Sequence, residues 1–436
     1  MRLSLAAIGV LAVTVAAPSA FPAGAPPAGS PVPLPAFPPP DTLPSTAEFP
    51  DPLVMRDGTK IATKKDWEEK RRPELKELFQ HYMYGRFPAK PEKVTAKVLF
   101  EDTKALGGKG TLREVELTFG PPEWPKLYLL IAAPNGTPPV ACFVGPNFGG
   151  NHLLTAHEQV RVPTVWVPGG YPGVEKGTNR ATAEGRGKQA DTWPLQQIVE
   201  SGYAVATFYC GDVQPDRPGV SEGMRATLPA AKDAPPADET ATVMWWAWGC
   251  HRAVDFLVTD PRTDAKRLAV VGHSRLGKTA LLAGAFDDRI AVVIPHQSGC
   301  GGAGPSRSKN PKAEPVKRIT TVFPHWFCAN FRAFGDDTTK IPFDQHSLVA
   351  ICAPRPVLAT NADDDQWANP PGQFDVLTAA APVYRLYGDA RPVAAKLPET
   401  GTLADERLGY FVRAGKHSMT PDDWKVFTRY ADKWLK

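Results

Sequence analysis

The distribution of hydrophobic and polar positions changes once along the chain, near Pro139. Before this point, three segments alternate apolar and polar residues, as antiparallel strands do when one face packs on a core. These segments are 93–103, 110–120 and 126–134. Ahead of them, the segment 64–85 predicts a helix that Pro73 interrupts.

After Pro139, short apolar runs end in polar or glycine-rich loops, and helix-like segments fall between them. The predicted strands, each given together with the loop that ends it, are 139–150, 202–212, 267–274, 290–299, 355–365 and 409–418, and the predicted helices are 192–201, 239–260 and 276–288. Buried parallel strands that alternate with helices predict a doubly wound, mostly parallel α/β sheet in a single domain. In such sheets the functional site lies at the carboxyl ends of the strands.

The N-terminus has the three parts of a secretory signal peptide: Arg2, an apolar run over 3–17, and small residues after it. The run is shorter than the ~20 residues of a membrane span. No cysteine follows it closely enough to carry a lipid, since the first is Cys142. We therefore expect a signal peptide over 1–22, a proline-rich lead-in over 23–55, a catalytic domain over 56–436, and a secreted or periplasmic monomer without a membrane anchor.

The composition excludes some function classes. A net charge of +4, with no dense run of lysine and arginine, gives no reason to expect nucleic acid as a partner. The six cysteines include no C-x-x-C pair, so zinc-site spacing is absent, and neither a metal nor a cofactor is predicted. Disulfides and buried free thiols remain equally open.

The segment 267–284, RLAVVGHSRLGKTALLAG, has the form of a strand, a sharp turn with Ser274, and a helix. A nucleophile elbow normally reads G-x-S-x-G, but Leu276 stands where the second glycine belongs, and the glycine comes one residue later. Ser274 is therefore either a nucleophile or a serine that caps a helix.

The rest of the chain favours a nucleophile. In α/β-hydrolases the order is serine, acid, histidine. His417 follows the last predicted strand and precedes a helix with Thr420 as its N-cap, while three aspartates at 363–365 follow an earlier strand. The oxyanion would be held by the backbone N–H of Arg275 and by the loop 145–152, although that loop could equally be only a turn.

At these residues the chain resembles carbohydrate esterase family 15, the glucuronoyl esterases, over roughly residue 51 to the C-terminus. The resemblance is carried by 272–302, 323–331, 342–370, and GKHS at 415–418 with the following Asp-Trp. The elbow of this family is G-x-S-R-x-G-K, with the late glycine seen here. The resemblance implies an α/β-hydrolase fold and a carboxylic ester hydrolase.

It also implies roles for individual residues. Arg275 would help to stabilise the oxyanion, while Lys278 and Glu314 would bind the hydroxyls of glucuronate. The D-x-W motif places Trp367 on the sugar and selects Asp365 as the acid. Gln345 and Trp326 are further pocket candidates. Without a binding role, Lys278 would be a solvated lysine, and Trp326 and Trp367 would be core residues.

One position departs from many members of the family, which carry the acid as a glutamate just before Ser-Gly. Here that position is Gln297, which cannot bear the charge that stabilises an imidazolium. In fungal relatives a disulfide joins a cysteine next to the serine to a cysteine after the histidine. At these two positions this chain has His273 and Ser418, so that bridge is absent. We therefore predict a Ser274–His417–Asp365 triad with Gln297 as a neutral neighbour.

The expected reaction is hydrolysis of the ester between (4-O-methyl-)glucuronic acid of glucuronoxylan and a lignin alcohol, through a glucuronoyl-enzyme. Two alternatives remain. One is an acetyl xylan esterase or another carbohydrate esterase of the same fold. The other is a secreted polysaccharide-binding protein that has lost its chemistry.

Overall fold

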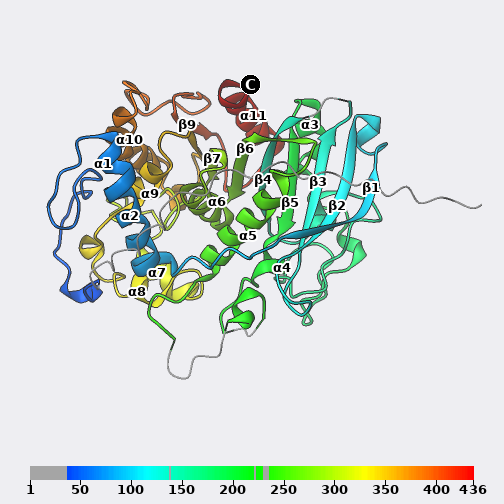
Figure 1. The fold of residues 1–436 in the computed structure, drawn as a ribbon, viewed down its shortest axis with the longest axis horizontal. Coiled ribbons are helices and arrows are strands. Elements are labelled where there is room, and N and C mark those ends of the chain that lie inside the picture. Colours follow the sequence, from blue (N-terminus) through cyan, green and yellow to red (C-terminus); the bar gives the residue numbers. More distant parts are fainter. Residues whose placement is uncertain (1–36, 137–138, 220–221, 229–234) are drawn as a thin grey trace, which may run out of the picture. The chain divides into compact units, whose positions relative to one another are not determined.

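Within the part of the chain that the computed structural model describes, residues 37–136, 139–219, 222–228 and 235–436, nine strands form one sheet (Figure 1). The strands are β1 (Thr95–Asp102), β2 (Gly110–Thr118), β3 (Leu127–Pro134), β4 (Val140–Asn147), β5 (Ala204–Tyr209), β6 (Thr263–His273), β7 (Ile290–His296), β8 (Val357–Ala362) and β9 (Leu408–Arg413). The expected signal peptide lies outside the described residues, as does the lead-in up to residue 36.

The order across the sheet is β1-β2-β3-β5-β4-β6-β7-β8-β9. Strands β1 to β3 pair antiparallel, and β3 also pairs antiparallel with β5. From β5 onward every pair is parallel. The prediction of an α/β-hydrolase sheet with antiparallel strands at its start is confirmed. The strand order reverses around β4, and this opens a crevice at the carboxyl ends of β4 and β6.

Helices cover both faces of the sheet. They are α1 (Lys64–Asp66), α2 (Arg72–Phe79), α3 (Leu195–Glu200), α4 (Cys210–Val213), α5 (Thr242–Leu257), α6 (Arg275–Phe286), α7 (Val316–Val322), α8 (Ala329–Arg332), α9 (Gln345–Ile351), α10 (Pro370–Leu386) and α11 (Pro421–Leu435). Val292 and Ile294 of β7 share a buried cluster with α11, whereas Val293 lies against Gly284 of α6. Because successive side chains of a strand point to opposite faces, α6 and α11 lie on opposite sides of the sheet.

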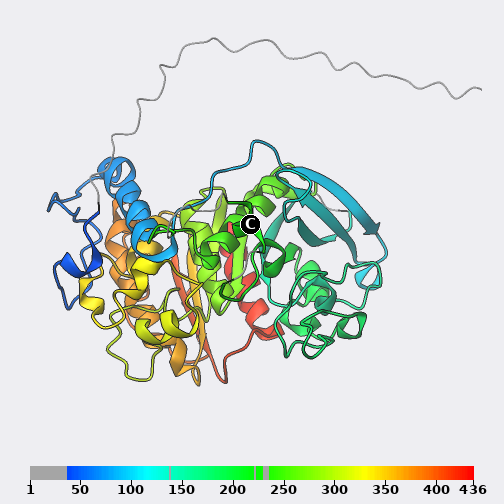
Figure 2. The same cartoon turned by 90° about the horizontal axis from the view of Figure 1, so that it is seen from below.

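The N-terminal helical segment runs from Lys64 to Tyr84 and includes two π-helical stretches. Pro73 is the second residue of α2, which follows the first π-helical stretch, and its missing N–H is tolerated at this position. The segment packs beside α8 and α9, next to the yellow and orange helices in Figures 1 and 2. The chain before it lies on the domain, since the Tyr82 hydroxyl donates to the carbonyl of Pro38 (2.7 Å).

Two further findings bear on the sequence analysis. All six cysteines are buried and their thiols are free, so the structure supports the second of the two alternatives. Among the described residues, no helix combines the length and the apolar character needed to cross a membrane.

Candidate active site

Ser274 lies in a strained turn between β6 and α6, with φ 56° and ψ −125°. Such a conformation is rare for a non-glycine residue and is typical of a nucleophile elbow. The serine occupies the N-cap position of α6, yet its side chain makes no capping hydrogen bond. The helix-capping alternative therefore has no support in the structure.

The late glycine is the one that the turn requires. A Cβ on Gly272 would lie 2.0 Å from the carbonyl oxygen of Leu276, and one on Gly277 would lie 2.8 Å from that of His296. Both positions must stay without a side chain because the backbone of α6 passes so close to the strands. Leu276 points away into the core, where it is fully buried.

His417 and Asp365 meet at the same end of the sheet. The aspartate follows β8 and the histidine follows β9, and Nδ1 of His417 lies 2.5 Å from Oδ2 of Asp365. The carboxylate is buried, with 6% of its side chain exposed, while 41% of the imidazole is exposed. A buried carboxylate on Nδ1 holds the imidazole in one tautomer, with Nε2 free to accept a proton.

Gln297 anchors the loop of His417 instead of contacting its ring. It follows β7 with φ 47°, and its Oε1 accepts the backbone N–H of Ser418 (2.9 Å). The carbonyl of Ser418 is bound as well, by Nε2 of His296 (2.9 Å) and by the Arg413 guanidinium (2.9 Å). Three side chains thus fix the residue next to His417.

Two histidines beside the site, the buried His296 and the half-buried His273, are neutral. Burial lowers the pKa of His296 to about 4, although Asp423 works against this shift. Burial and the neighbouring His296 and His417 hold the pKa of His273 well below its usual range. The His273 ring lies between the other two, with centroid distances of 5.0 Å to His296 and 4.5 Å to His417. A structural role is therefore the one that fits His273 and His296.

Ser274, Arg275 and His417 line one cavity of ≈ 290 Å³. Its other walls come from the loop after β4, from the segment 171–193, and from Met419. Tyr171 and Trp193 belong to these walls, and no motif in the sequence pointed to them. A pocket with apolar and aromatic walls around a partly exposed nucleophile suits an organic ester.

Only a few backbone N–H groups at the cavity are candidates to donate to the oxyanion. The first N–H groups of α6 have no acceptor within the helix, so the N–H of Arg275 is available beside Ser274. In the loop after β4, Oδ1 of Asn147 accepts the N–H of Gly150 (2.9 Å) and thereby removes it as a donor. Phe148 and Gly149, which also line the cavity, carry the remaining N–H groups of this loop.

The guanidinium of Arg275 is fixed by an acid that the sequence did not reveal. Nε of Arg275 forms an ion pair with Oδ2 of Asp216 (2.6 Å), without the geometry of a hydrogen bond. The same carboxylate accepts from the indole of Trp326 (2.6 Å) and contacts His325. Burial acts to raise the pKa of Asp216, but the His325 hydrogen bond and the Arg275 charge outweigh it and lower the pKa.

Trp326 therefore supports Arg275. Its side chain is buried, with 4% exposed, and the Arg275 guanidinium lies 5.6 Å from its ring centroid. The guanidinium also lies 4.7 Å from the ring of Phe148. Trp326 is not among the residues that line the Ser274 cavity.

Lys278, Glu314 and Trp367 form a second group, which also lies outside that cavity. Lys278 is 4% exposed and its Nζ donates to the carbonyls of Ser298 and Cys300, both at 2.6 Å. A solvated lysine is thus excluded, and one of its three N–H bonds remains for a ligand. Burial lowers the pKa of Lys278, while the charge of Glu314 works against this shift.

Glu314 and Trp367 contact each other through backbone and side chain. The Glu314 N–H donates to the carbonyl of Trp367 (3.1 Å). Burial raises the pKa of Glu314, and both Lys278 and a hydrogen bond from Trp367 limit the rise. The Trp367 side chain is 49% exposed, so it is not a core tryptophan. An exposed indole beside a buried ammonium and a carboxylate can bind a sugar ring.

Gln345 lies beneath this group. It is fully buried, and its Nε2 donates to the carbonyl of Gly302 and to the Tyr84 hydroxyl (3.3 Å). Gly302 belongs to the loop whose carbonyls hold Lys278, so Gln345 supports that loop. Its Oε1 is buried and has no hydrogen-bond partner in the described part of the chain.

Comparison with known proteins identifies relatives over most of the chain. The family model described as "Glucuronyl esterase, fungi" matches residues 199–388. Carbohydrate esterase MZ0003, from an unknown prokaryotic organism, is 42% identical over 392 residues, which are 88% of this chain and 89% of that protein. A promiscuous esterase of carbohydrate esterase family 15 from a marine bacterial metagenome has a TM-score of 0.83 and 41% identity, over 91% of this chain and 99% of that chain. The glucuronoyl esterase from Solibacter usitatus has a TM-score of 0.82 and 32% identity, over 91% and 100% of the two chains.

Proposed function

Because the chain belongs to carbohydrate esterase family 15, the glucuronoyl esterases, and is a carboxylic ester hydrolase, we propose that it uses a Ser274–His417–Asp365 triad. The proposed substrate is the ester between the C6 carboxyl of (4-O-methyl-)glucuronic acid on glucuronoxylan and an alcohol of lignin. The observation that carries the triad is the contact of 2.5 Å between His417 Nδ1 and Asp365 Oδ2, at the cavity that contains Ser274.

The reaction proceeds in two steps. Nε2 of His417 takes the proton of Ser274 as Oγ attacks the C6 carbonyl, and the negative charge on the carbonyl oxygen is held by Arg275. The bond from C6 to the alcohol oxygen then breaks, and the alcohol leaves with the proton from His417. Water, deprotonated by the same imidazole, attacks C6 of the glucuronoyl-enzyme; the bond from C6 to Oγ breaks, and His417 returns the proton to Ser274 as the uronate leaves.

The uronate ring is proposed to bind at the second group. The ester has no negative charge, so a cationic clamp for a carboxylate is unnecessary. The free N–H of Lys278 and the Glu314 carboxylate would bind ring hydroxyls, and the exposed face of Trp367 would stack on the ring. An acetyl ester would use none of these contacts, which favours the glucuronoyl ester over the acetyl xylan esterase alternative.

The test is hydrolysis of benzyl glucuronate, with p-nitrophenyl acetate as the comparison ester. We expect the parent chain to cleave the glucuronate and Ser274→Ala to abolish that activity, while Ser201→Ala, at the end of α3, keeps it. Cleavage of the acetate alone would contradict the substrate. If Ser274→Ala still cleaves both esters, Ser274 is not the nucleophile. An inactive chain that binds glucuronoxylan would be the non-catalytic alternative.

We also propose export from the cytoplasm and action as a monomer. The expected signal peptide over 1–22 and the polymeric nature of the substrate support export. Mass spectrometry of the mature N-terminus after expression with the leader tests it, and light scattering tests the monomer.

A further inference from the structure

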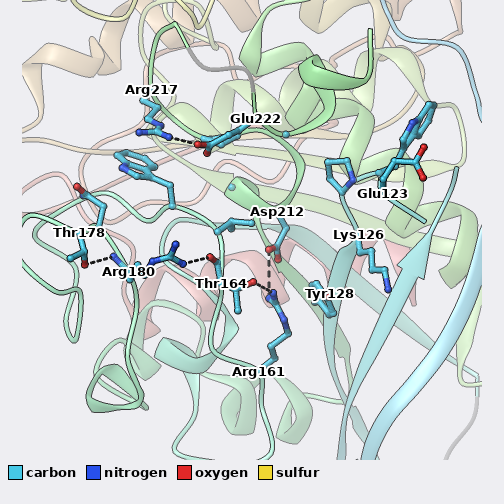
Figure 3. A pocket seen from close by; sticks show the side chains of 18 residues that line it. Glu123, Lys126, Tyr128, Arg161, Thr164, Thr178, Arg180, Asp212, Arg217 and Glu222 are labelled. Carbon is cyan, nitrogen blue, oxygen red and sulfur yellow. Dashed lines mark hydrogen bonds and ion pairs between the residues drawn. The ribbon is translucent and has the colours of Figure 1, made fainter. Parts of the chain in front are cut away.

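A second cavity, larger than the one at Ser274, lies at the same end of the sheet. Its volume is ≈ 620 Å³, and it shares no lining residue with the Ser274 cavity. Its walls come from the start of β3, the loops 161–166 and 178–180, and the segment after β5 (Figure 3). A volume of this size is typical of ligand sites, roughly 300 to 1,000 Å³.

The second cavity lies a short distance from the elbow. Leu130 of β3 pairs antiparallel with Thr207 of β5, so the start of β3 lies beside the carboxyl end of β5. The order β3-β5-β4-β6 then places the cavity up to three strands from Ser274, on the order of 15 Å at the usual strand spacing. Asp216, which holds Arg275, lies in the chain between Pro215 and Arg217, and these two line the second cavity.

Aromatic rings form much of this cavity. Trp124, Tyr128 and Trp166 all line it, and each of the three is partly exposed. The Arg217 guanidinium lies 5.1 Å from the ring centroid of Trp166, and that of Arg161 lies 3.8 Å from the ring of Tyr128. Partly exposed rings present flat apolar surfaces on which a ligand ring can stack.

Two polar groups in the cavity lack a hydrogen-bond partner among the described residues. Asp212 is 4% exposed, and its nearest cation is Arg161, whose Nη1 lies 3.7 Å from Oδ1, too far for a hydrogen bond (Figure 3). Burial raises the pKa of Asp212 to about 7, although the Arg161 charge works against the rise. Nε of Arg217 is buried without a partner as well. Buried polar groups are normally satisfied, so one acceptor and one donor are available for a ligand.

The charges of the cavity nearly balance. Its four basic residues face three acidic ones, and most are already paired. The pairs are Arg217–Glu222 (2.6 Å), Arg161–Asp212 (3.7 Å) and, to a residue outside the cavity, Lys126–Glu116 (3.0 Å). A strongly anionic ligand would find an excess of only one positive charge. Hydroxyl groups, which both donate and accept, fit the free acceptor and the free donor.

We propose that this cavity binds a neutral, unesterified segment of the polysaccharide whose uronate ester is cleaved at Ser274. The inference rests on the proposed function for the identity of the polysaccharide. Sugar rings stack on Trp166 and Trp124, Asp212 accepts hydrogen bonds from ring hydroxyls, and Arg217 donates one. The site thereby holds the polymer while the ester enters the Ser274 cavity.

The first test measures binding by calorimetry, with xylotetraose as the probe and the full chain with Ser274→Ala as the protein. We expect saturable binding to one site. In this background Trp166→Ala and Asp212→Asn weaken it at least tenfold. Trp434→Ala is the matched control, because Trp434 is a partly exposed tryptophan with the Arg407 guanidinium 4.6 Å from its ring, and it lies outside the cavity. We expect that control to bind as the parent does.

A second test compares substrates. Asp212→Asn, which leaves the side-chain volume nearly unchanged, is expected to raise KM for esterified glucuronoxylan several-fold more than KM for benzyl glucuronate. Xylotetraose that binds equally to Trp166→Ala and the parent, or not at all, overturns the proposal. Binding of benzyl alcohol in its place, abolished by Trp166→Ala, overturns it in favour of an aromatic leaving group. The calorimetric result needs no turnover, so failure of the esterase activity is distinguishable from failure of this site.

Discussion

His417 is oriented by Asp365, whose Oδ2 lies 2.5 Å from its Nδ1, while Gln297 contacts only the backbone of the next residue, Ser418. The negative charge beside the imidazole therefore comes from the loop after β8 and not from the end of β7. Asp365 is buried and also accepts the backbone N–H of Ala368 (3.3 Å), which fixes its orientation. The separate roles of Asp365 and Gln297 explain how a chain with glutamine at position 297 keeps a charged partner for its histidine.

Gln297→Ala is expected to reduce kcat for benzyl glucuronate by no more than about tenfold. The change removes one hydrogen bond to the N–H of Ser418, worth about 1 kcal/mol, and leaves the bonds to the Ser418 carbonyl in place. Gln297→Glu keeps an acceptor there and serves as the conservative control. A loss of a thousandfold in Gln297→Ala would show that the glutamine does more than anchor the loop.

Trp367→Ala is expected to raise KM for benzyl glucuronate about tenfold, the equivalent of one lost ring contact of about 1.4 kcal/mol. The thermal midpoint should stay near that of the parent, because the side chain is 49% exposed. Trp367→Phe, which retains a flat ring, should recover most of the affinity. An increase in KM for p-nitrophenyl acetate of the same size would contradict a role on the sugar.

Asp216→Asn tests whether the position of Arg275 matters. The carboxylate holds Arg275 at 2.6 Å, and its neutralisation frees the guanidinium to leave the oxyanion. We expect kcat to fall about 10- to 100-fold with little change in KM, since the contact is used in the transition state. The matched control is Asp422→Asn, an exposed aspartate paired with Lys425. Equal kcat values for the two variants would exclude this role of Asp216.

The buried histidines should make the protein less stable in mild acid. Burial lowers the pKa of His251 to about 4, and unfolding restores it to about 6.5. Between these values the unfolded state binds a proton that the native state does not, so stability falls as pH falls from about 6.5 toward 4. For one histidine the loss between pH 7 and pH 5 is about 2 kcal/mol.

Urea unfolding of the parent and of His251→Asn at both pH values checks this expectation. The variant should be less stable at pH 7, because it loses the contact of Nε2 with the carbonyl of Ala283 (2.9 Å). Its stability should fall by about 2 kcal/mol less than that of the parent between pH 7 and pH 5. Parallel losses in the two proteins would exclude His251 as a source of the acid sensitivity.

Much of the fold could be predicted because it is encoded in local periodicity. The alternation over 93–134 matches the antiparallel strands β1 to β3, and the apolar runs after Pro139 match the parallel strands. Helix α10 could not be predicted as easily, because Pro370, Pro371 and Pro382 obscure its pattern.

The candidate site, too, could be predicted only in part. Ser274, Asp365 and His417 each follow a strand, so chain order alone places them at one end of the sheet. Asp216 carries no such signal. It reaches Arg275 only because the loop after β5 folds over the start of α6, and sequence spacing does not encode that contact. The second cavity combines four segments that lie apart in the sequence, so it was equally hidden.

The most direct measurement is kcat for benzyl glucuronate in Asp365→Asn, beside Asp364→Asn as an exposed neighbouring control. Asparagine keeps the shape of the aspartate side chain, but it carries no negative charge and does not hold His417 in the same tautomer. We expect Asp365→Asn to lose about 10³- to 10⁴-fold in kcat and Asp364→Asn to retain the parent value. A kcat for Asp365→Asn within tenfold of the parent would contradict the Ser274–His417–Asp365 triad.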